Sequence, residues 1–176
     1  MKKLTKAVAI ASMMTAGVMS AQTATAEVSA SVDLATAYLF RGVNLNNSAP
    51  LISAGLAYDH ESGLYTNIWA GGADASADTG TEYDITVGFA KEFGDVGVDL
   101  GYVSYIYPTT SNDEINDFAE YYIGVSFAGV GLSVTKLVDP DKDADYEYIA
   151  VDGGMGDFSA MVGFLNAEAD DANYAH

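Results

Sequence analysis

Apolar and polar residues alternate along most of the chain after residue 27, with the period of two that is typical of β-strands. In the segment 28–41 the even positions are mostly apolar and the odd positions mostly small or polar, so Arg41 falls on the polar face. The same alternation recurs at 81–93, 96–108, 120–127, 130–138 and 158–166, and less cleanly at 50–59, 63–72 and 146–152. The pattern predicts nine strands and an all-β protein.

The predicted connections alternate between short and long. The short ones read "DHESG", "EFGD", "FAGV" and "GGMGD", and the long ones read "RGVNLNNSAP", "GGADASADTG", "PTTSNDEIND" and "DPDKDAD". Short turns at one end of a sheet and long acidic loops at the other are typical of bacterial outer-membrane barrels. We therefore expect an antiparallel transmembrane β-barrel with its short turns in the periplasm. A secreted soluble β-barrel or β-sandwich shows the same alternation and remains an alternative.

Residues 1–26 have the features of a secretory signal peptide. Three lysines precede a short apolar core at 7–20, and Ala24-Thr25-Ala26 supplies the small residues of a cleavage site. The core is too short to span a bilayer comfortably as a helix. We expect an exported protein whose barrel domain covers residues 27–176, located in the outer membrane of a Gram-negative cell.

The charge balance narrows the possible partners. Without Lys2, Lys3 and Lys6, four basic residues remain against 25 acidic ones, a net charge of −21 (4 − 25). Such a surface repels nucleic acid and attracts cations. No cysteine is present, and His60 and His176 are the only histidines, so we expect neither an enzyme nor a cofactor.

Aromatic residues gather near the ends of the predicted strands. Such residues are expected to form the two interfacial belts of a membrane barrel. The set near the long loops is Tyr38, Phe40, Tyr83, Tyr105, Tyr107 and Tyr121, and the set near the short turns is Tyr58, Phe93, Phe127 and Phe158.

Single-chain bacterial barrels have an even number of strands, and nine strands are predicted here. The sequence ends at "NYAH", where a tenth strand would begin. We therefore expect the barrel domain to lack at least its last strand in this chain.

Several motifs are similar to those of one family. "YLFRGVNLNNSAPLISAGLAYDHESGLYTNIWAGGAD", together with "DLGYVSYIYP" and "EYYIGVSFAG", resembles the proteobacterial TorF family of porins over most of residues 28–166. The resemblance rests on Tyr38, the Phe40-Arg41-Gly42 triplet, the turn at 60–63, Tyr65, Trp69 and 102–108. It implies an exported, all-β, outer-membrane protein with a pore, and it names no solute.

The polar face supplies candidate residues for a channel lining. A lumenal arginine opposite carboxylates is a pattern that sorts solutes by charge at a constriction, and it is equally the pattern of a structural ion pair. The candidate lumen or constriction residues are Arg41, Asp33, Glu82, Asp84, Asp99 and Glu120.

Three further features have less specific chemistry. Asp139, Asp141, Asp143, Asp145 and Glu147 alternate in a way that resembles a calcium loop, but without its glycine and glutamate register, so a solvated acidic loop is the alternative. His60 is expected in an exposed turn in which Gly63 has positive φ. Trp69 is interpreted either as a ligand-stacking residue or as a space-filling one.

The sequence thus favours a passive outer-membrane channel for small solutes. Because the predicted lining is acidic, we expect this channel to prefer cations. The expected partners are outer-membrane lipid and small solutes or cations. A closed barrel with a structural or adhesive role is the second hypothesis.

Overall fold

The computed structural model describes residues 26–46, 49–72, 80–108, 114–138, 146–155 and 158–167. Within these residues the ordered elements are all strands, and none of the described residues forms a helix that is long and apolar enough to cross a membrane. The predicted signal peptide, apart from residue 26, lies outside the described residues. The strands are β1 (Glu27–Ala35), β2 (Leu39–Phe40), β3 (Val43–Asn44), β4 (Leu51–Asp59), β5 (Leu64–Gly72), β6 (Thr81–Phe93), β7 (Val96–Ile106), β8 (Phe118–Phe127), β9 (Val130–Val138), β10 (Tyr146–Met155) and β11 (Phe158–Ala167).

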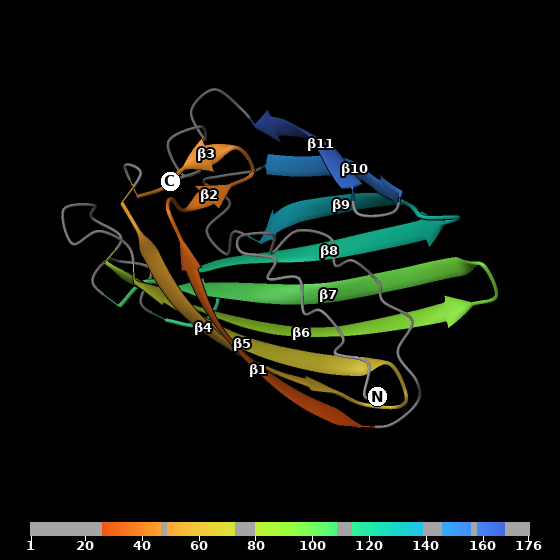
Figure 1. Cartoon of the computed structure of the whole chain (residues 1–176), viewed down its shortest axis with the longest axis horizontal. Coiled ribbons are helices and arrows are strands. Elements are labelled where there is room, and N and C mark those ends of the chain that lie inside the picture. Colours follow the sequence, from red (N-terminus) through yellow and green to blue (C-terminus); the bar gives the residue numbers. More distant parts are fainter. Residues whose placement is uncertain are drawn as a thin grey trace, which may run out of the picture.

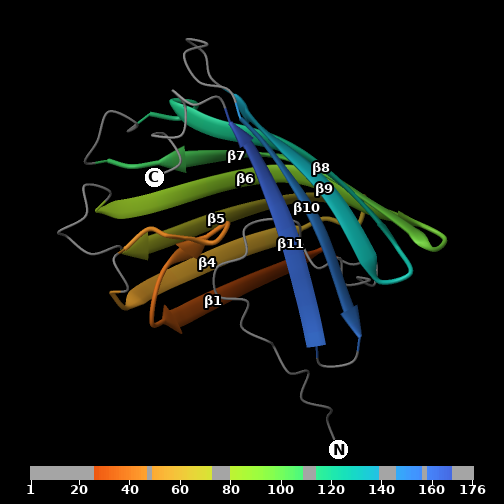
Figure 2. The same cartoon turned by 90° about the horizontal axis from the view of Figure 1, so that it is seen from above.

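Nine of these strands form one antiparallel sheet in the order β1-β4-β5-β6-β7-β8-β9-β10-β11. Each strand therefore pairs with the next long strand along the chain, and the sheet curls strongly from β1 to β11 (Figures 1 and 2). The nine predicted strands are confirmed. Among the described residues β1 and β11 are each paired on one side, so this sheet is open.

The antiparallel strands finish alternately at two ends of the sheet. The turn end is the end at which β4, β6, β8 and β10 finish, and the loop end is the one at which β1, β5, β7 and β9 finish. Much of the sequence predicted as long acidic loops lies outside the described residues. At the turn end, the backbone N–H of His60 donates to the carbonyl of Leu64 (2.8 Å), and Gly63 has φ 99°. The predicted tight turn with an exposed His60 is confirmed.

The register assigns each residue to one of two faces, because directly paired residues on neighbouring strands point the same way. Trp69 pairs with Asp84, Asp84 with Tyr105, and Tyr105 with Phe118, which makes one row across β5, β6, β7 and β8. We call the face that carries this row the inner face and the opposite one the outer face. Tyr105 is 2% exposed and Asp84 1% exposed, so the inner face is covered at this level.

The outer face is apolar and exposed. Leu34 is 77% exposed, Ile52 64%, Ile123 52% and Phe164 64%, and similar side chains occupy the outward positions of every long strand. The alternation in the sequence therefore corresponds to an inner face of small, polar and aromatic residues and an outer face of mostly exposed aliphatic and aromatic ones.

The first strand is shorter than the pattern predicts. β1 ends at Ala35, and the chain then forms a separate hairpin, β2–β3, whose two-residue turn is Arg41-Gly42. Both turn residues have positive φ (49° and 85°), as a type I′ hairpin turn requires, and Gly42 tolerates this conformation without strain. Arg41 is thus in a turn and not on a sheet strand.

Only some of the aromatic residues predicted for the two belts lie on the outer face. The four residues near the turns are outward and exposed, as are Tyr83 (41%) and Tyr121 (50%) at the loop end. Tyr38, Tyr105 and Tyr107 are instead at most 7% exposed and face the interior. Their hydroxyl groups bind inner-face carboxylates, which an interfacial position would not provide.

Candidate functional site at the loop end

Hydrogen bonds within residues 38–49 close the base of the β2–β3 hairpin. The backbone N–H of Leu45 donates to the carbonyl of Tyr38 (2.9 Å), and that of Tyr38 donates to Asn46 Oδ1 (2.8 Å). Asn46 Nδ2 in turn donates to the carbonyl of Ala49 (2.6 Å). Asn46 is fully buried, so its amide replaces the backbone pairing that the chain loses on leaving the sheet.

Arg41 at the tip of the hairpin binds Glu120 of β8 through two parallel hydrogen bonds. Nη1 donates to Oε1 and Nη2 to Oε2, both at 2.7 Å. The side chains are 6% and 1% exposed. Tyr105 also donates to Glu120 Oε2 (2.9 Å), and Tyr146 donates to Oε1. This bidentate geometry is the strongest form of an arginine–carboxylate pair, and here it fastens the hairpin to the sheet.

Aromatic rings surround the guanidinium group of Arg41. Its carbon lies 4.6 Å from the ring centroids of Phe40 and Tyr148, and 5.6 Å from that of Tyr146. Burial lowers the pKa of Arg41, but the hydrogen bonds and the charge of Glu120 outweigh it and raise the pKa overall. The arginine therefore stays charged, and its charge is matched within the site.

A second pair of carboxylates lies on β6 at the same end. Glu82 and Asp84 are 4% and 1% exposed, and Tyr107 donates to Glu82 Oε1 at 2.6 Å. Asp84 Oδ1 is buried with no hydrogen-bond partner in the described residues. Burial first, and then the charge of Glu82, raises the pKa of both Tyr38 and Tyr107. The two phenols therefore act as neutral hydrogen-bond donors beside this pair.

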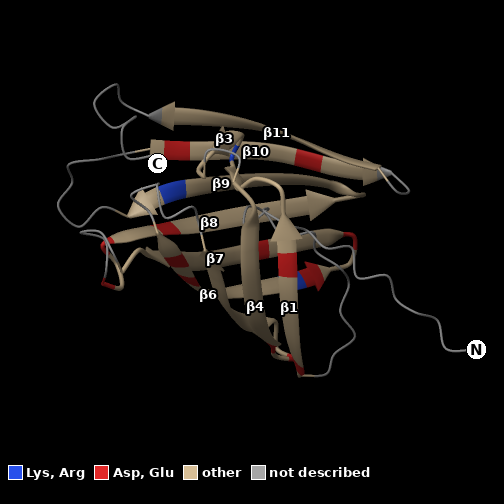
Figure 3. Cartoon of the chain, turned by 60° about the vertical axis from the view of Figure 1, so that its left-hand side comes forward, with Lys and Arg blue, Asp and Glu red and all other residues tan. Residues whose placement is uncertain are grey.

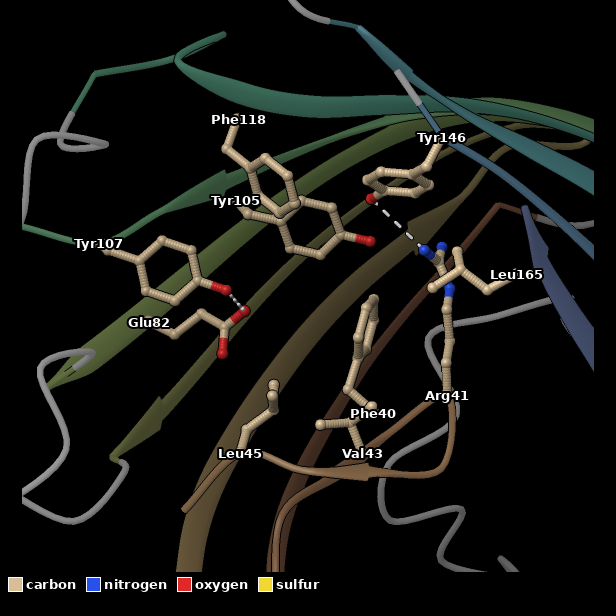
Figure 4. Close-up of a pocket in the computed structure, with 10 residues that line it drawn as sticks. All are labelled: Phe40, Arg41, Val43, Leu45, Glu82, Tyr105, Tyr107, Phe118, Tyr146 and Leu165. Atoms are coloured by element: carbon tan, nitrogen blue, oxygen red, sulfur yellow. Dashed lines mark hydrogen bonds between the residues drawn. The ribbon is translucent and has the colours of Figure 1, made fainter. Parts of the chain in front are cut away.

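A pocket separates the hairpin from the sheet (Figure 4). Its empty space is about 530 Å³, a volume that includes space open to solvent. Most of its lining is apolar or aromatic. The lining residues are Phe40, Arg41, Val43, Leu45, Glu82, Tyr105, Tyr107, Phe118, Tyr146 and Leu165.

A separate polar group bridges the inner face nearer the turn end. Tyr65, Gly88, Gly101 and Tyr122 are paired in that order across β5, β6, β7 and β8. The two tyrosine rings extend over the two glycines until their hydroxyl groups meet, and Tyr65 also donates to Asp99 Oδ1 (2.8 Å). Bare glycines beneath the rings make this flat arrangement possible.

The structure brings together four of the six predicted lining residues. Arg41 and Glu120 form the ion pair, and Glu82 and Asp84 are successive inward residues of β6 at the same end of the sheet. Asp99 belongs to the separate tyrosine group. Asp33 lies on the edge strand β1, half-buried and opposite Ser53. Acidic positions outnumber basic ones along the strands (Figure 3).

The structure also describes part of the predicted acidic run and Trp69. Of the acidic run, residues 139–145 lie outside the described residues, whereas Glu147 is in β10 directly opposite Lys136. In the described parts of the chain, no three metal-ligating side chains lie close enough to hold an ion. Trp69 covers Gly71 and packs beside Tyr38, with 5.9 Å between ring centroids, which fits the space-filling interpretation.

Several residues of the site were not predicted as site residues from the sequence, among them Asn46, Tyr105, Tyr146 and Tyr148. The alternation does place Tyr105 on the polar face, together with Val103 and Tyr107, and this was the available signal. Asn46 gave none, because its role depends on a hairpin that the alternation conceals.

These features define the class of protein: an all-β, antiparallel protein whose large sheet is apolar outside and carries tyrosines and carboxylates inside. The chain belongs to a family described as "Bacterial protein of unknown function (Gcw_chp)", whose sequence model matches residues 19–169. No curated protein and no solved structure matches the chain.

Proposed function

We propose that this protein is an outer-membrane β-barrel that acts as a passive channel for small solutes and favours cations. The observation that carries the proposal is the exposed apolar outer face. Side chains such as Leu34, Ile52 and Phe164 are each more than 60% exposed, on strands whose other face is polar. Contiguous exposed apolar surface of this extent marks a contact with lipid or protein, and in a β-barrel the outward band meets lipid.

The expectation of cation preference rests on the inner-face charges. Asp33, Asp84, Asp99 and Asp152 point inward, as do Glu82 and Glu120. Among the described residues Arg41 is the basic group recorded at these carboxylates, and it is already paired with Glu120. A lining of one sign attracts the opposite ion into a pore.

The position of the β2–β3 hairpin favours a narrow opening of the channel at the loop end. It occupies the inner side of the loop end (Figure 1), where Arg41 ties it to Glu120. In this proposal the Arg41–Glu120 pair sets the width of the opening, so the structural and filtering roles of Arg41 coincide.

The TorF resemblance agrees with this proposal. Among the motif residues, Tyr38 and Arg41 lie at the base and the tip of the hairpin. Trp69 packs beside Tyr38, and Tyr65 bridges the inner face. The resemblance also favours export through a signal peptide at residues 1–26. We therefore also propose that this signal peptide directs export and that the protein lies in the outer membrane.

A closed barrel with a structural or adhesive role is the second candidate. The observation in its favour is the packing of the inner face, where the hairpin fills the loop end and tyrosines cover the glycines nearer the turns. A sheet filled from both ends leaves less room for solute.

The experiment is single-channel recording of the full-length gene product in a planar bilayer under a potassium chloride gradient. Heat-modifiable gel mobility first verifies a folded barrel. We expect discrete steps with a cation-selective reversal potential, and larger steps for Arg41→Gln, which releases the hairpin. Lys91→Gln, an exposed change outside the site, serves as the matched control. A folded protein that conducts no current contradicts the channel and favours the closed barrel.

A further inference from the structure

The pocket beneath the hairpin has an excess of negative charge. Glu82 lines it, and Asp84 is two residues along the same face of β6. Arg41 also lines it, but two hydrogen bonds already commit its charge to Glu120. In the described residues neither Glu82 nor Asp84 forms an ion pair with Lys or Arg, so both carboxylates lack a counter-charge.

Among the described residues, an oxygen without a hydrogen-bond partner belongs to Asp84, which is paired across the sheet with the pocket residue Tyr105. Asp84 Oδ1 is buried and takes no hydrogen bond within the described part of the chain. Leaving a buried carboxylate oxygen without a partner costs free energy that a bound donor restores. The groups recorded as hydrogen-bonded to Glu82 are the phenols of Tyr107 and Tyr38 and the carboxyl group of Asp84, and none of them carries a positive charge.

The walls of the pocket suit an organic cation better than a metal ion. Phe40, Tyr105, Tyr107 and Phe118 contribute rings, and Val43 and Leu45 contribute aliphatic surface. Aromatic faces attract organic ammonium groups, whereas a metal ion needs more oxygen ligands than two carboxylates supply.

We propose that this pocket binds a small organic ammonium ion, with its cationic head at Glu82 and Asp84 and its apolar body against the aromatic wall. The inference deepens the proposed function, because it names a class of solute for the same loop-end site. The pocket itself is defined by the hairpin and the sheet, so binding can be tested whether or not the protein conducts.

The test measures binding to the folded full-length protein in detergent by isothermal titration calorimetry. Three probes share one ring and differ in charge: benzylammonium, benzyl alcohol and benzoate. We expect benzylammonium to bind at least about tenfold more tightly than benzyl alcohol, a difference of about 1.4 kcal/mol. Benzoate should show no heat of binding.

Two variants locate the site. Glu82→Gln keeps the hydrogen-bonding shape but removes the charge, so it should weaken benzylammonium binding by about tenfold or more. Asp152→Asn is the matched control, since it neutralises an inward carboxylate on β10 outside the pocket and should leave binding unchanged. If Glu82→Gln does not fold, the probe series on the unaltered protein still decides the proposal.

Equal affinity for benzylammonium and benzyl alcohol overturns the proposal, as does the absence of binding by all three probes. Full displacement of benzylammonium by an equal concentration of K⁺ overturns the preference for an organic cation. If binding fails while cation-selective conductance is present, this inference is wrong and the channel stands. If benzylammonium binds to a protein that conducts no current, the channel is wrong and the pocket stands.

Discussion

At the scale of single residues, one arginine organises the loop end. Arg41 has a positive φ of 49°, which is unfavourable for a residue with a Cβ atom, and it is held there by what its side chain reaches. That side chain spans from the hairpin to Glu120 on β8 and lies between aromatic rings. Its ion pair is therefore what couples the hairpin to the sheet.

Removing the arginine should destabilise the fold strongly. Arg41→Ala leaves Glu120 buried without its counter-charge, which costs about 3–5 kcal/mol when one partner of a buried pair is lost. Urea unfolding in detergent micelles, followed by tryptophan fluorescence, measures the loss. Adding Glu120→Leu to Arg41→Ala should restore part of it, because the unpaired charge is then absent. A loss below about 0.5 kcal/mol for Arg41→Ala would contradict a fastening role.

The buried phenols predict a loss of stability at high pH. Burial and Glu82 raise the pKa of Tyr38 and Tyr107, whereas an unfolded tyrosine titrates near pH 10. Above that pH the unfolded chain binds fewer protons than the folded one, so the free energy of unfolding falls as pH rises. Each phenol should contribute a decline of about 1.4 kcal/mol per pH unit above pH 10. Urea unfolding from pH 8 to pH 11 tests this.

Tyr107→Phe provides the comparison for that series. It removes one titrating group, so the decline above pH 10 should become shallower while the protein still folds. An identical slope in both proteins would show that Tyr107 ionises normally in the folded state.

At the scale of elements, the strands could be predicted from the sequence and the hairpin could not. The period of two locates all nine sheet strands, because one face of each is apolar and the other is not. The alternation continues through residue 40, across the break after Ala35, so the chain's departure from the sheet leaves no mark in the pattern. Arg41-Gly42 is a two-residue turn, but arginine is an unusual residue at positive φ and gave no signal of one.

The candidate site was predictable to the same limited degree. Alternation placed Glu82, Asp84 and Glu120 on the inner face, since these residues occupy regular strand positions. The partner of each depends on side chains brought in by the hairpin or by distant strands. Tyr146 reaches Glu120 from 26 residues away, and Arg41 from 79, and no local pattern encodes such contacts.

The row of tyrosines over glycines makes a prediction about strand packing. A Cβ atom at Gly88 would lie 2.3 Å from Tyr65 Cζ, and one at Gly101 would lie 2.4 Å from Tyr122 Cζ. Gly88→Ala should therefore displace a ring and destabilise the protein by about 1–3 kcal/mol, as overpacking does. Gly72→Ala is the control, because its added Cβ would meet nothing within 4 Å. Equal urea midpoints for the two variants would contradict the packing role of the glycines.

At the scale of the whole molecule, the two faces of the sheet are sorted in the opposite sense to a soluble sandwich, which buries its apolar face. Here most of the polar side chains lie inside, where several bind one another, and aliphatic ones such as Val32 (76% exposed) and Leu34 (77%) lie outside. A nine-stranded sheet with this arrangement has a large exposed apolar surface, which in the proposed outer-membrane location would meet lipid. The stability of the folded chain should therefore depend on lipid.

A charge on the outer face tests that dependence directly. Ile123 is 52% exposed near the middle of β8, and Ile123→Lys would place an ammonium group against lipid at a cost of about 2–4 kcal/mol near the bilayer midplane. Ser126→Lys on the same strand puts the same charge on the inner face, where water and carboxylates are accessible, so it should be tolerated much better. Folding into lipid vesicles, followed by heat-modifiable mobility, measures both. If Ile123→Lys folds as well as Ser126→Lys and is more soluble without lipid, the outer face is in contact with water. The proposal of a transmembrane barrel is then wrong.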